Sequence, residues 1–219
     1  MGGNVIIWGA GGHAKVVADI LLCTGFSLAG LIDDVTPTRR AAPFAEALVL
    51  GGERELIQVY AAGVHQGIIG FGDNTRRLAA AATLKSYGFE LIRAIHPSAI
   101  LSSSASVGPG SMIAAGAVVN PSAVLGKCVI VNTNAAVDHD CIIGDGAHIG
   151  PGVTVAGTVQ IGERAWIGAG ATVIDGKRIG AGAIVGAGSV VIDDVPERVL
   201  VVGIPARVIR ELDRATEPL

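Results

Sequence analysis

His139 and His148 are the side chains in this sequence best suited to proton transfer and ligand binding. His139 stands between Asp138 and Asp140, and a carboxylate beside an imidazole favours its protonated form, which makes the ring a stronger base. The pattern therefore predicts a general base at His139, against the alternative of a solvated side chain on a turn. His148 could hydrogen-bond a ligand or merely pack on a neighbouring ring, and the sequence leaves both open.

A glycine-rich turn near the N-terminus is typical of phosphate binding. Gly9 to Ala14 reads GAGGHA, which matches G-x-G-x-x-G/A between a predicted strand and a predicted helix. Glycines let the backbone approach phosphate oxygens, and Asp33, at the end of a second predicted strand, could accept a hydrogen bond from a ribose or a base. The turn alone indicates NAD. About 90 residues hold only one mononucleotide-binding half, however, so a diphosphate-linked sugar fits better, and a tight turn without a ligand remains the alternative.

Residues 1–93 are predicted to form a small Rossmann-like βαβ domain with a parallel sheet. Strands are expected at 5–8, 28–32 and 64–70, and helices at 14–22, 52–62 and 74–87. Asn74 is expected to be the N-cap of the last helix. The buried side of the first helix is expected to hold Val16, Val17, Ile20 and Leu21.

A six-residue period governs the rest of the chain, residues 94–219. Every sixth position from 95 to 191 is Ile, Leu or Val, seventeen in register without an insertion, and the residues four places later are mostly small, Lys177 being the main exception. Such a unit keeps its aliphatic residue on one side only if a short strand is followed by a bend, so the chain must coil and pair its backbone between coils. We expect a parallel β-helix with three hexads to a coil, and Cys141 in its core rather than acting as a nucleophile.

Eighteen residues per coil place residues eighteen apart one above the other. His139 then lies between Pro121 and Gly157, and Gly157 has no side chain to cover the imidazole, so a reactant could approach from that side. His148 is expected to stack with Trp166. A further column exposes backbone that could pair with an extended amide-bearing ligand, although tight turns alone would explain it. That column consists of Thr133, Pro151, Ala169 and Ala187.

The composition excludes several classes of protein. A net charge of −3, a pI near 5.9 and 4% aromatic residues leave no basic surface for nucleic acid and few rings to stack on bases. Mean hydropathy is +0.57, but Pro97, Pro109 and Pro121 interrupt the uncharged stretch 94–126, so no membrane span is expected. The N-terminus carries no leader pattern, and the three cysteines form no CxxC pair. We expect a cytoplasmic protein without disulfides or a metal site.

Together these motifs resemble the bacterial sugar O-acyltransferases of the sialic acid O-acetyltransferase type. Within that group they resemble the nucleotide-linked 4-amino-sugar N-acetyltransferases of bacillosamine and perosamine synthesis. The resemblance covers essentially the whole chain, with one departure at Gly11, where some relatives have Ser. The residues that carry it are Gly9–His13, Leu31–Asp34, Asn132–Thr133, Asp138–Asp140, Gly144–Asp145, His148 and Gly203–Arg207.

The resemblance implies a left-handed β-helix and a homotrimer whose active sites lie between subunits. It implies acetyl-CoA as co-substrate and a nucleotide-linked amino sugar as acceptor, with UDP or GDP and the sugar stereochemistry left open. In the implied site, His139 is the general base and Asp140 strengthens it. The implied ligand contacts are His148, Ala169 and Ala187 for acetyl-CoA, and Gly11, Gly12, His13, Asp33, Asp34 and Gly72 for the nucleotide sugar.

The expected reaction is direct transfer of an acetyl group to the C4 amine of a nucleotide-linked 4-amino-4,6-dideoxy sugar, for surface glycan synthesis such as that of O-antigen. One alternative is O-acetylation of a sugar hydroxyl, because an alcohol needs the same base at the same distance. A second is a non-catalytic trimer that binds nucleotide sugars. A third is a dehydrogenase that binds NAD at the glycine-rich turn.

Overall fold

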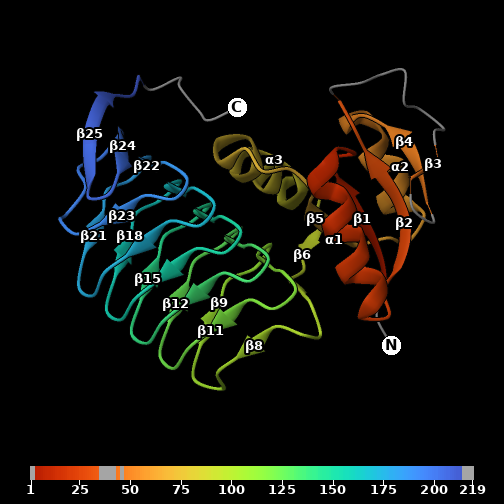
Figure 1. The fold of residues 1–219 in the computed structure, drawn as a ribbon. Coiled ribbons are helices and arrows are strands. Elements are labelled where there is room, and N and C mark those ends of the chain that lie inside the picture. Colours follow the sequence, from red (N-terminus) through yellow and green to blue (C-terminus); the bar gives the residue numbers. More distant parts are fainter. Residues whose placement is uncertain (1–2, 35–42, 45–46, 214–219) are drawn as a thin grey trace.

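The computed structural model of the chain describes residues 3–34, 43–44 and 47–213. Figure 1 shows an α/β domain beside an elongated coil of short strands, with helix α3 (Asn74–Ser86) between the two. Among the described residues, no helix has the length and apolar character needed to cross a bilayer. This arrangement confirms the predicted fold class, a Rossmann-like unit followed by a β-helix.

The N-terminal domain is a mainly parallel sheet of six strands in the order β3-β4-β2-β1-β5-β6. Helix α1 packs on one face together with the start of the coil, and α2 and α3 pack on the other, because successive residues of β1 point to opposite faces. The strands are β1 (Asn4–Trp8), β2 (Ser27–Ile32), β3 (Pro43–Phe44), β4 (Ala47–Gly51), β5 (Gln66–Ile69) and β6 (Glu90–Leu91). The helices are α1 (Gly12–Cys23), η2 (Glu53–Glu55, a 3-10 turn), α2 (Leu56–Ala61) and α3.

Two details of the predicted helices are wrong. The N-cap of α3 is Asp73, whose carboxylate accepts from the Arg76 amide at 2.7 Å, while Asn74 is the first helical residue and is buried. Aspartate and asparagine cap equally well, so the sequence did not separate them. On α1, Val16 is 37% exposed because it turns away from the sheet, whereas Val17, Ile20 and Leu21 are buried as expected.

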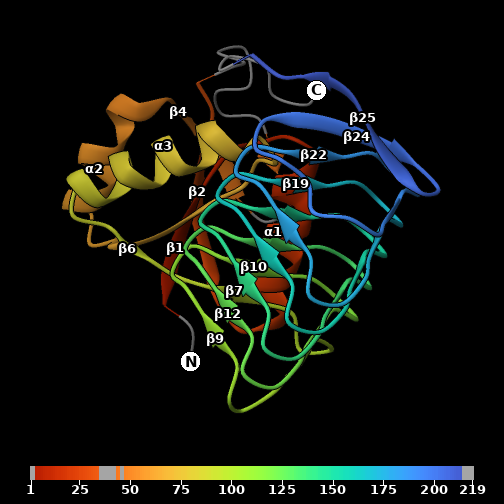
Figure 2. The same ribbon diagram turned by 90° about the vertical axis from the view of Figure 1, so that its left-hand side faces the viewer.

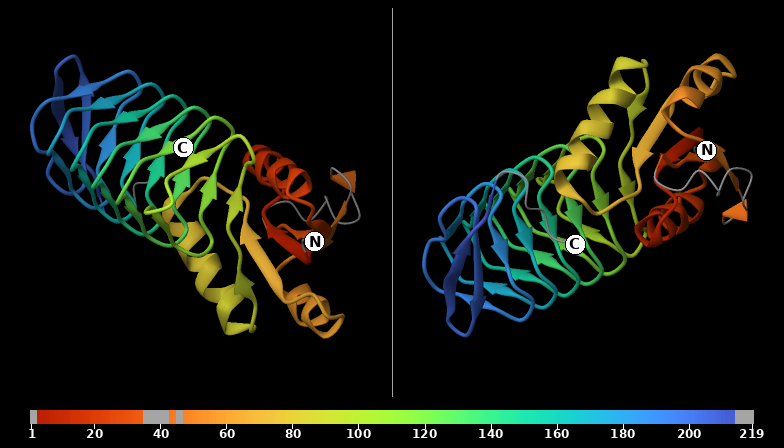
Figure 3. Two further views of the ribbon diagram at one scale, coloured as in Figure 1. Left: turned by 90° about the horizontal axis from the view of Figure 1, so that it is seen from below. Right: turned by 90° about the horizontal axis from the view of Figure 1, so that it is seen from above.

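The coil has three faces, in which two-residue strands pair in parallel with the strands eighteen residues away. The first face ends in two longer strands: β24 (Val199–Gly203) pairs in parallel with β22 (Ile184–Val185), and β25 (Ala206–Glu211) pairs antiparallel with β24. Figure 3 shows the coils stacked along one axis, with the hairpin of β24 and β25 at the end farthest from the N-terminal domain. The first face holds β7 (Ala94–Ile95), β10 (Met112–Ile113), β13 (Ile130–Val131), β16 (His148–Ile149), β19 (Trp166–Ile167), β22 (Ile184–Val185), β24 (Val199–Gly203) and β25 (Ala206–Glu211). The second holds β8 (Ile100–Leu101), β11 (Val118–Val119), β14 (Ala136–Val137), β17 (Thr154–Val155), β20 (Thr172–Val173) and β23 (Val190–Val191). The third holds β9 (Ser106–Val107), β12 (Val124–Leu125), β15 (Ile142–Ile143), β18 (Gln160–Ile161) and β21 (Arg178–Ile179).

The hexad positions build the core and the corners as the period predicts. The aliphatic series fills the interior together with the small series, which includes the fully buried Cys141. Every sixth residue from 110 to 188 has a positive φ, which turns the chain at each corner. Eight of these residues are glycines, and the others are Ser122, Cys128, Asn134, Asp140, Thr158 and Arg164. Because a left-handed conformation costs a non-glycine residue about 1–2 kcal/mol, the coil hydrogen bonds must hold these corners.

Candidate active site

His139 lies at the corner between the second and third faces, after β14 and before β15. Its Nδ1 is 2.8 Å from Oδ2 of Asp140, and both side chains are more than half exposed. An ionised carboxylate only accepts, so Nδ1 carries the proton and Nε2 has a free lone pair. The hydrogen bond that His139 donates to Asp140, and then the charge of Asp138, raise the pKa of His139. The ring is thus oriented and made more basic.

Asp138 is held on the other side of this corner. Its Oδ1 accepts from the His139 amide at 2.7 Å and from Nδ2 of Asn120, one coil away, at 2.8 Å. These two hydrogen bonds, that of His139 first, lower the pKa of Asp138. The carboxylate therefore stays ionised and fixes the backbone that carries the imidazole.

Gly157 lies directly against the imidazole, as the eighteen-residue period predicts. A Cβ placed on Gly157 would be 2.7 Å from both Cε1 and Nε2 of His139. The Gly157 amide donates to Oδ1 of Asp175 at 3.2 Å, which holds this part of the coil. The absence of a side chain at Gly157 is what allows His139 its position and leaves Nε2 uncovered.

His148 points outward from the first face, under the N-terminal domain, where it is 7% exposed. Its ring stacks on Trp166 with centroids 5.2 Å apart and planes 8° apart, which confirms the predicted pair. Its Nε2 is 3.3 Å from Nδ2 of Asn132. Burial, and then the charge of Arg77, lower the pKa of His148 to about 3. The imidazole is therefore neutral at physiological pH and offers one acceptor nitrogen.

The structure brings His13 and Gly72 to the same place from the N-terminal domain. The His13 ring lies 6.3 Å from that of His148, and a Cβ on Gly72 would be 3.8 Å from Cε1 of His148. Burial, and then Arg77, lower the pKa of His13 to about 4. Its buried Nε2 has no hydrogen-bond partner within the described part of the chain. Gly11 and Gly12 begin α1 nearby, and a Cβ on either would meet no atom within 4 Å.

Asp33 and Asp34 follow β2 and border two clefts at the carboxyl ends of the sheet strands. Asp34 accepts from Nε1 of Trp8 at 2.8 Å and from the Glu53 amide at 2.7 Å, and Asp33 is 8% exposed. One cleft, of about 700 Å³, is lined by both aspartates, 51–55 and Tyr87. The other, of about 240 Å³, adds Trp8, Phe71 and Arg76. Clefts at this end of a parallel sheet are where nucleotides bind in open α/β folds.

Ala169 and Ala187 lie exposed at the corner between the first and second faces. Within the described residues, neither of their amides donates a backbone hydrogen bond, whereas the Ala169 carbonyl accepts from Gly188 at 2.8 Å. The coils are close here, since a Cβ on Gly168 would be 2.6 Å from the Ala187 nitrogen. The column therefore presents two free N–H donors that an extended ligand could use.

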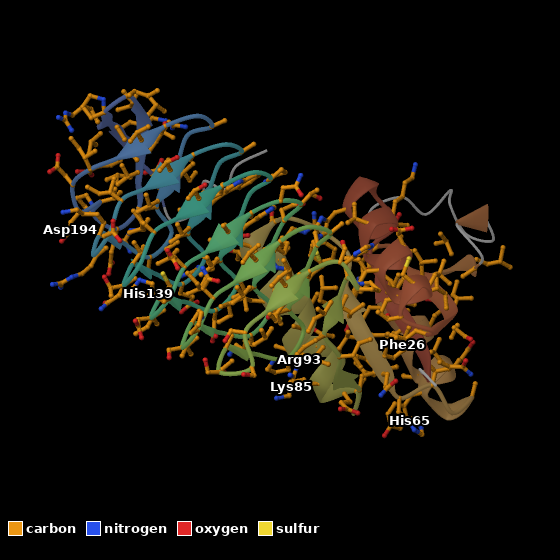
Figure 4. The ribbon with its side chains drawn as sticks, turned by 60° about the horizontal axis from the view of Figure 1, so that its bottom comes forward. Phe26, His65, Lys85, Arg93, His139 and Asp194 are labelled. Carbon is orange, nitrogen blue, oxygen red and sulfur yellow. The ribbon has the colours of Figure 1, made fainter. Side chains whose placement is uncertain are left out.

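The predicted site residues of the coil thus fall into two groups. His139 and Asp140 lie at one edge of the second face, and Ala169 and Ala187 lie at its other edge, next to His148 on the first face. Figure 4 shows His139 on the coil, away from the N-terminal domain. Within one chain the base is therefore separated from the residues expected to bind the two substrates.

Among the residues that the structure describes, one group of side chains has donor atoms of the kind that bind metal ions. Asp19 and Cys23 of α1 and His96 bring one ligand atom each to within 4.8 Å of one another. However, Nδ1 of His96 accepts from the Ser98 amide at 3.0 Å, so Nε2 carries the proton. Exposed acidic groups often lie this close together without an ion, so the proximity of these three side chains alone assigns no metal site.

Several residues around the site were missed at the sequence level. Asn120 could have been found, because it lies eighteen residues before Asp138 and its side chain bonds to it. Asn132 was noted only as part of the motif Asn132–Thr133, and its approach to His148 was not expected, because it lies sixteen residues away and off the regular column. Arg77 was given no role and Asn74 only that of an N-cap, since their contacts depend on how the two domains pack.

Comparisons with known proteins agree with this architecture. Residues 4–84 match the model of the PglD N-terminal domain, and residues 122–157 and 158–193 match the bacterial transferase hexapeptide (six repeats). A search of curated proteins found no match.

Solved structures resemble nearly the whole chain. A histidine mutant of GDP-perosamine N-acetyltransferase from Caulobacter crescentus, in complex with CoA and GDP-perosamine, is 40% identical with a TM-score of 0.91, over 95% of this chain and 97% of that one. The acetyltransferase domain of PglB from Neisseria gonorrhoeae, in complex with acetyl coenzyme A, is 34% identical with a TM-score of 0.87, over 95% of this chain and all (100%) of that one. WeeI from Acinetobacter baumannii is 27% identical with a TM-score of 0.86, over 94% and 100% of the two chains.

The fold and these matches define a hexapeptide-repeat acyltransferase with a PglD-type N-terminal domain and a left-handed β-helix. The chain belongs to the family of nucleotide-linked amino-sugar N-acetyltransferases. The resemblance seen in the sequence motifs is confirmed.

Proposed function

We propose that this enzyme transfers the acetyl group of acetyl-CoA to the C4 amine of a nucleotide-linked 4-amino-4,6-dideoxy sugar. Two similar structures support the co-substrate, since one holds CoA with GDP-perosamine and the other holds acetyl coenzyme A. Whether the nucleotide is UDP or GDP is decided by the experiment below.

The observation that carries the proposal is the His139–Asp140 pair with its uncovered Nε2. As the amine nitrogen attacks the thioester carbonyl, Nε2 takes the proton that the nitrogen loses, and a carbon–nitrogen bond forms. Collapse of the tetrahedral intermediate breaks the carbon–sulfur bond, and the CoA sulfur leaves with the proton that His139 held. Between these two steps Asp140 stabilises the imidazolium through its hydrogen bond with Nδ1 of His139, in which Nδ1 and Oδ2 are 2.8 Å apart. No acyl-enzyme is required.

The other predicted site residues are assigned to substrate binding. The free amides of Ala169 and Ala187 suit the amide-bearing pantetheine arm, and neutral His148 offers it a hydrogen bond. Gly11, Gly12 and His13 at the start of α1 suit the diphosphate, and Asp33 and Asp34 suit the ribose or base. Gly72 is assigned to the nucleotide sugar and lies against His148, one of the residues assigned to acetyl-CoA.

We further propose that the active form is a homotrimer with each site shared by two chains. The separation of His139 from the binding residues in one chain supports this. A second copy could bring the edge that carries Ala169 and Ala187 next to the edge that carries His139. Apolar side chains are exposed on the second and third faces, where Ile100 is 65%, Val124 47% and Ile142 52% exposed. Such side chains favour burial against another copy.

A substrate panel tests the proposed function. UDP- and GDP-linked 4-amino sugars, and the matching hydroxy sugars, are incubated with acetyl-CoA and analysed by mass spectrometry. We expect a mass gain of one acetyl group on an amino sugar only. Acetylation of the hydroxy sugars instead would assign an O-acetyltransferase, and no binding of CoA in calorimetry would leave a non-catalytic binding protein.

The same panel includes His139→Ala. A general base contributes about 10²- to 10⁴-fold to rate, so this variant is expected to lose most of kcat while it still binds both substrates. Turnover close to that of the wild type would remove His139 from this role.

A further inference from the structure

Helix α3 meets the β-helix through two buried polar side chains to which the proposed mechanism gives no part. Arg77 is 1% exposed, and Asn74 is 2% exposed. Figure 2 shows α3 beside the coil, and both side chains donate hydrogen bonds to carbonyls of the coil, so they lie where the two domains pack. Because a buried guanidinium is costly unless its donors are paired, this contact depends on a defined geometry.

The acceptors of these two side chains form one column on the coil. Arg77 donates through Nε to the Cys128 carbonyl at 2.9 Å and through Nη2 to the Gly146 carbonyl at 2.7 Å. Asn74 donates through Nδ2 to the Arg164 carbonyl at 2.9 Å and accepts from Arg77 at 2.8 Å. Cys128, Gly146 and Arg164 are spaced eighteen apart at positive-φ corners. The pair therefore grips three successive coils at one edge, a set we call the carbonyl column.

The carbonyl column lies next to the outward residues of the first face. His148 comes two residues after Gly146, and Trp166 comes two residues after Arg164. Arg77 also donates through Nη1 to the Gly72 carbonyl at 2.6 Å. One guanidinium thus holds both the coil segment that carries His148 and the loop that lies against its ring.

The charge of Arg77 acts on the same rings. After burial, it is the largest cause that lowers the pKa of His148 and of His13. The groups that act on His148 are Arg77 from α3 and His13 from α1, together with the Gly72 backbone. Arg77 therefore helps to keep both imidazoles neutral, each with one acceptor nitrogen.

We propose that Arg77, together with Asn74, is a positioning residue for acetyl transfer, which fixes the register between the two domains and so holds His148 and Gly72 where the two substrates meet. The inference rests on the proposed function, since it takes His148 and Gly72 as substrate contacts. The planar fork of Arg reaches several carbonyls at once, and Lys, a single point charge on a flexible stem, does not replace it.

Kinetics of Asn74→Ala, Arg77→Lys and Arg77→Met test the proposal, with Lys85→Met on the exposed side of α3 as the matched control. Rates are measured at a temperature where circular dichroism shows each variant folded. A displacement of about 1 Å can cost about 10²-fold in rate, so we expect kcat/KM to fall by roughly that factor in Asn74→Ala and Arg77→Lys, and not in the control. A lower Tm with unchanged kcat/KM would overturn the positioning role.

Imidazole NMR without substrates gives a readout independent of activity. In Arg77→Met the His148 titration should move to higher pH, because a positive charge is lost, while Arg77→Lys should keep a low midpoint but shift the ring resonances. If Arg77→Met does not fold, Asn74→Ala and Arg77→Lys carry the test. A wild type that transfers no acetyl group overturns the proposed function. Normal transfer in these variants with unmoved His148 resonances overturns the positioning role alone.

Discussion

Replacing Gly157 with Ala should impair His139 without changing that residue itself. The added Cβ would be 2.7 Å from Cε1 and Nε2 of the imidazole, whereas ordinary contacts between such atoms are about 3.5–4.0 Å. The ring must therefore retreat by roughly 1 Å, which takes it out of line with Asp140, now 2.8 Å from Nδ1. The φ of Gly157 lies outside the left-handed region, so alanine meets no backbone strain there.

A misplacement of about 1 Å can cost about 10²-fold in rate, and we expect kcat of Gly157→Ala to fall by about that factor. The assay is acetyl transfer measured by release of free CoA thiol. The control is the same substitution in the His139→Ala background, where it should cause little further loss because the imidazole is already gone. A wild-type kcat in Gly157→Ala, or an equal loss in both backgrounds, would refute the reasoning.

Three further changes follow from the same geometry. His139 works as a base only when its imidazole is neutral, so kcat should rise with pH through the raised pKa of His139. In Asp140→Asn the pKa of His139 falls, so the rise in kcat should move to lower pH, with a smaller loss of kcat than in His139→Ala. A rise in kcat at the same pH as in the wild type would contradict the pairing of His139 with Asp140. Ala169→Pro removes an N–H that donates no backbone hydrogen bond, so KM for acetyl-CoA should rise about fivefold, which corresponds to roughly 1 kcal/mol. Tm should not change, because the neighbouring coil already holds Pro151 at the same corner. An unchanged KM would mean that this amide does not bind the cofactor. Asp73→Ala should lower the free energy of unfolding by about 1 kcal/mol in a urea titration, because the hydrogen bond that caps the Arg76 amide is lost. An unchanged free energy of unfolding would mean that Asp73 does not cap α3.

The coil and the surroundings of His139 were predictable because they repeat. A strict period fixes which residues stack, so Gly157 against His139 and Trp166 against His148 follow from positions eighteen apart. Side-chain direction follows too, since inward and outward residues alternate along each short strand. The wrong N-cap of α3 shows the limit of local signals, as Asp73 and Asn74 are adjacent and chemically alike.

What could not be predicted depends on contacts between parts far apart in the sequence. Arg77 is one of two adjacent arginines on a helix, and only the packing of α3 on the coil buries it and leaves Arg76 at the cleft. The meeting of His13, Gly72 and His148 has the same origin, because no repeat links the two domains. The separation of His139 from the binding residues depends on which corner of the coil each of them occupies, and the six-residue period alone does not identify the corner that the N-terminal domain covers.

Complementation between two inactive variants tests most directly whether His139 acts on substrates bound by another chain. His139→Ala lacks the base, and Gly11→Asp places a carboxylate where the diphosphate is expected, at a position where a Cβ meets no atom within 4 Å. Each variant alone should be inactive. Co-expressed in equal amounts and mixed at random, they should recover about a quarter of wild-type activity, because one site in four would pair an intact His139 from one chain with an intact glycine-rich turn from the other. No recovery in mixed oligomers would contradict a site shared between chains.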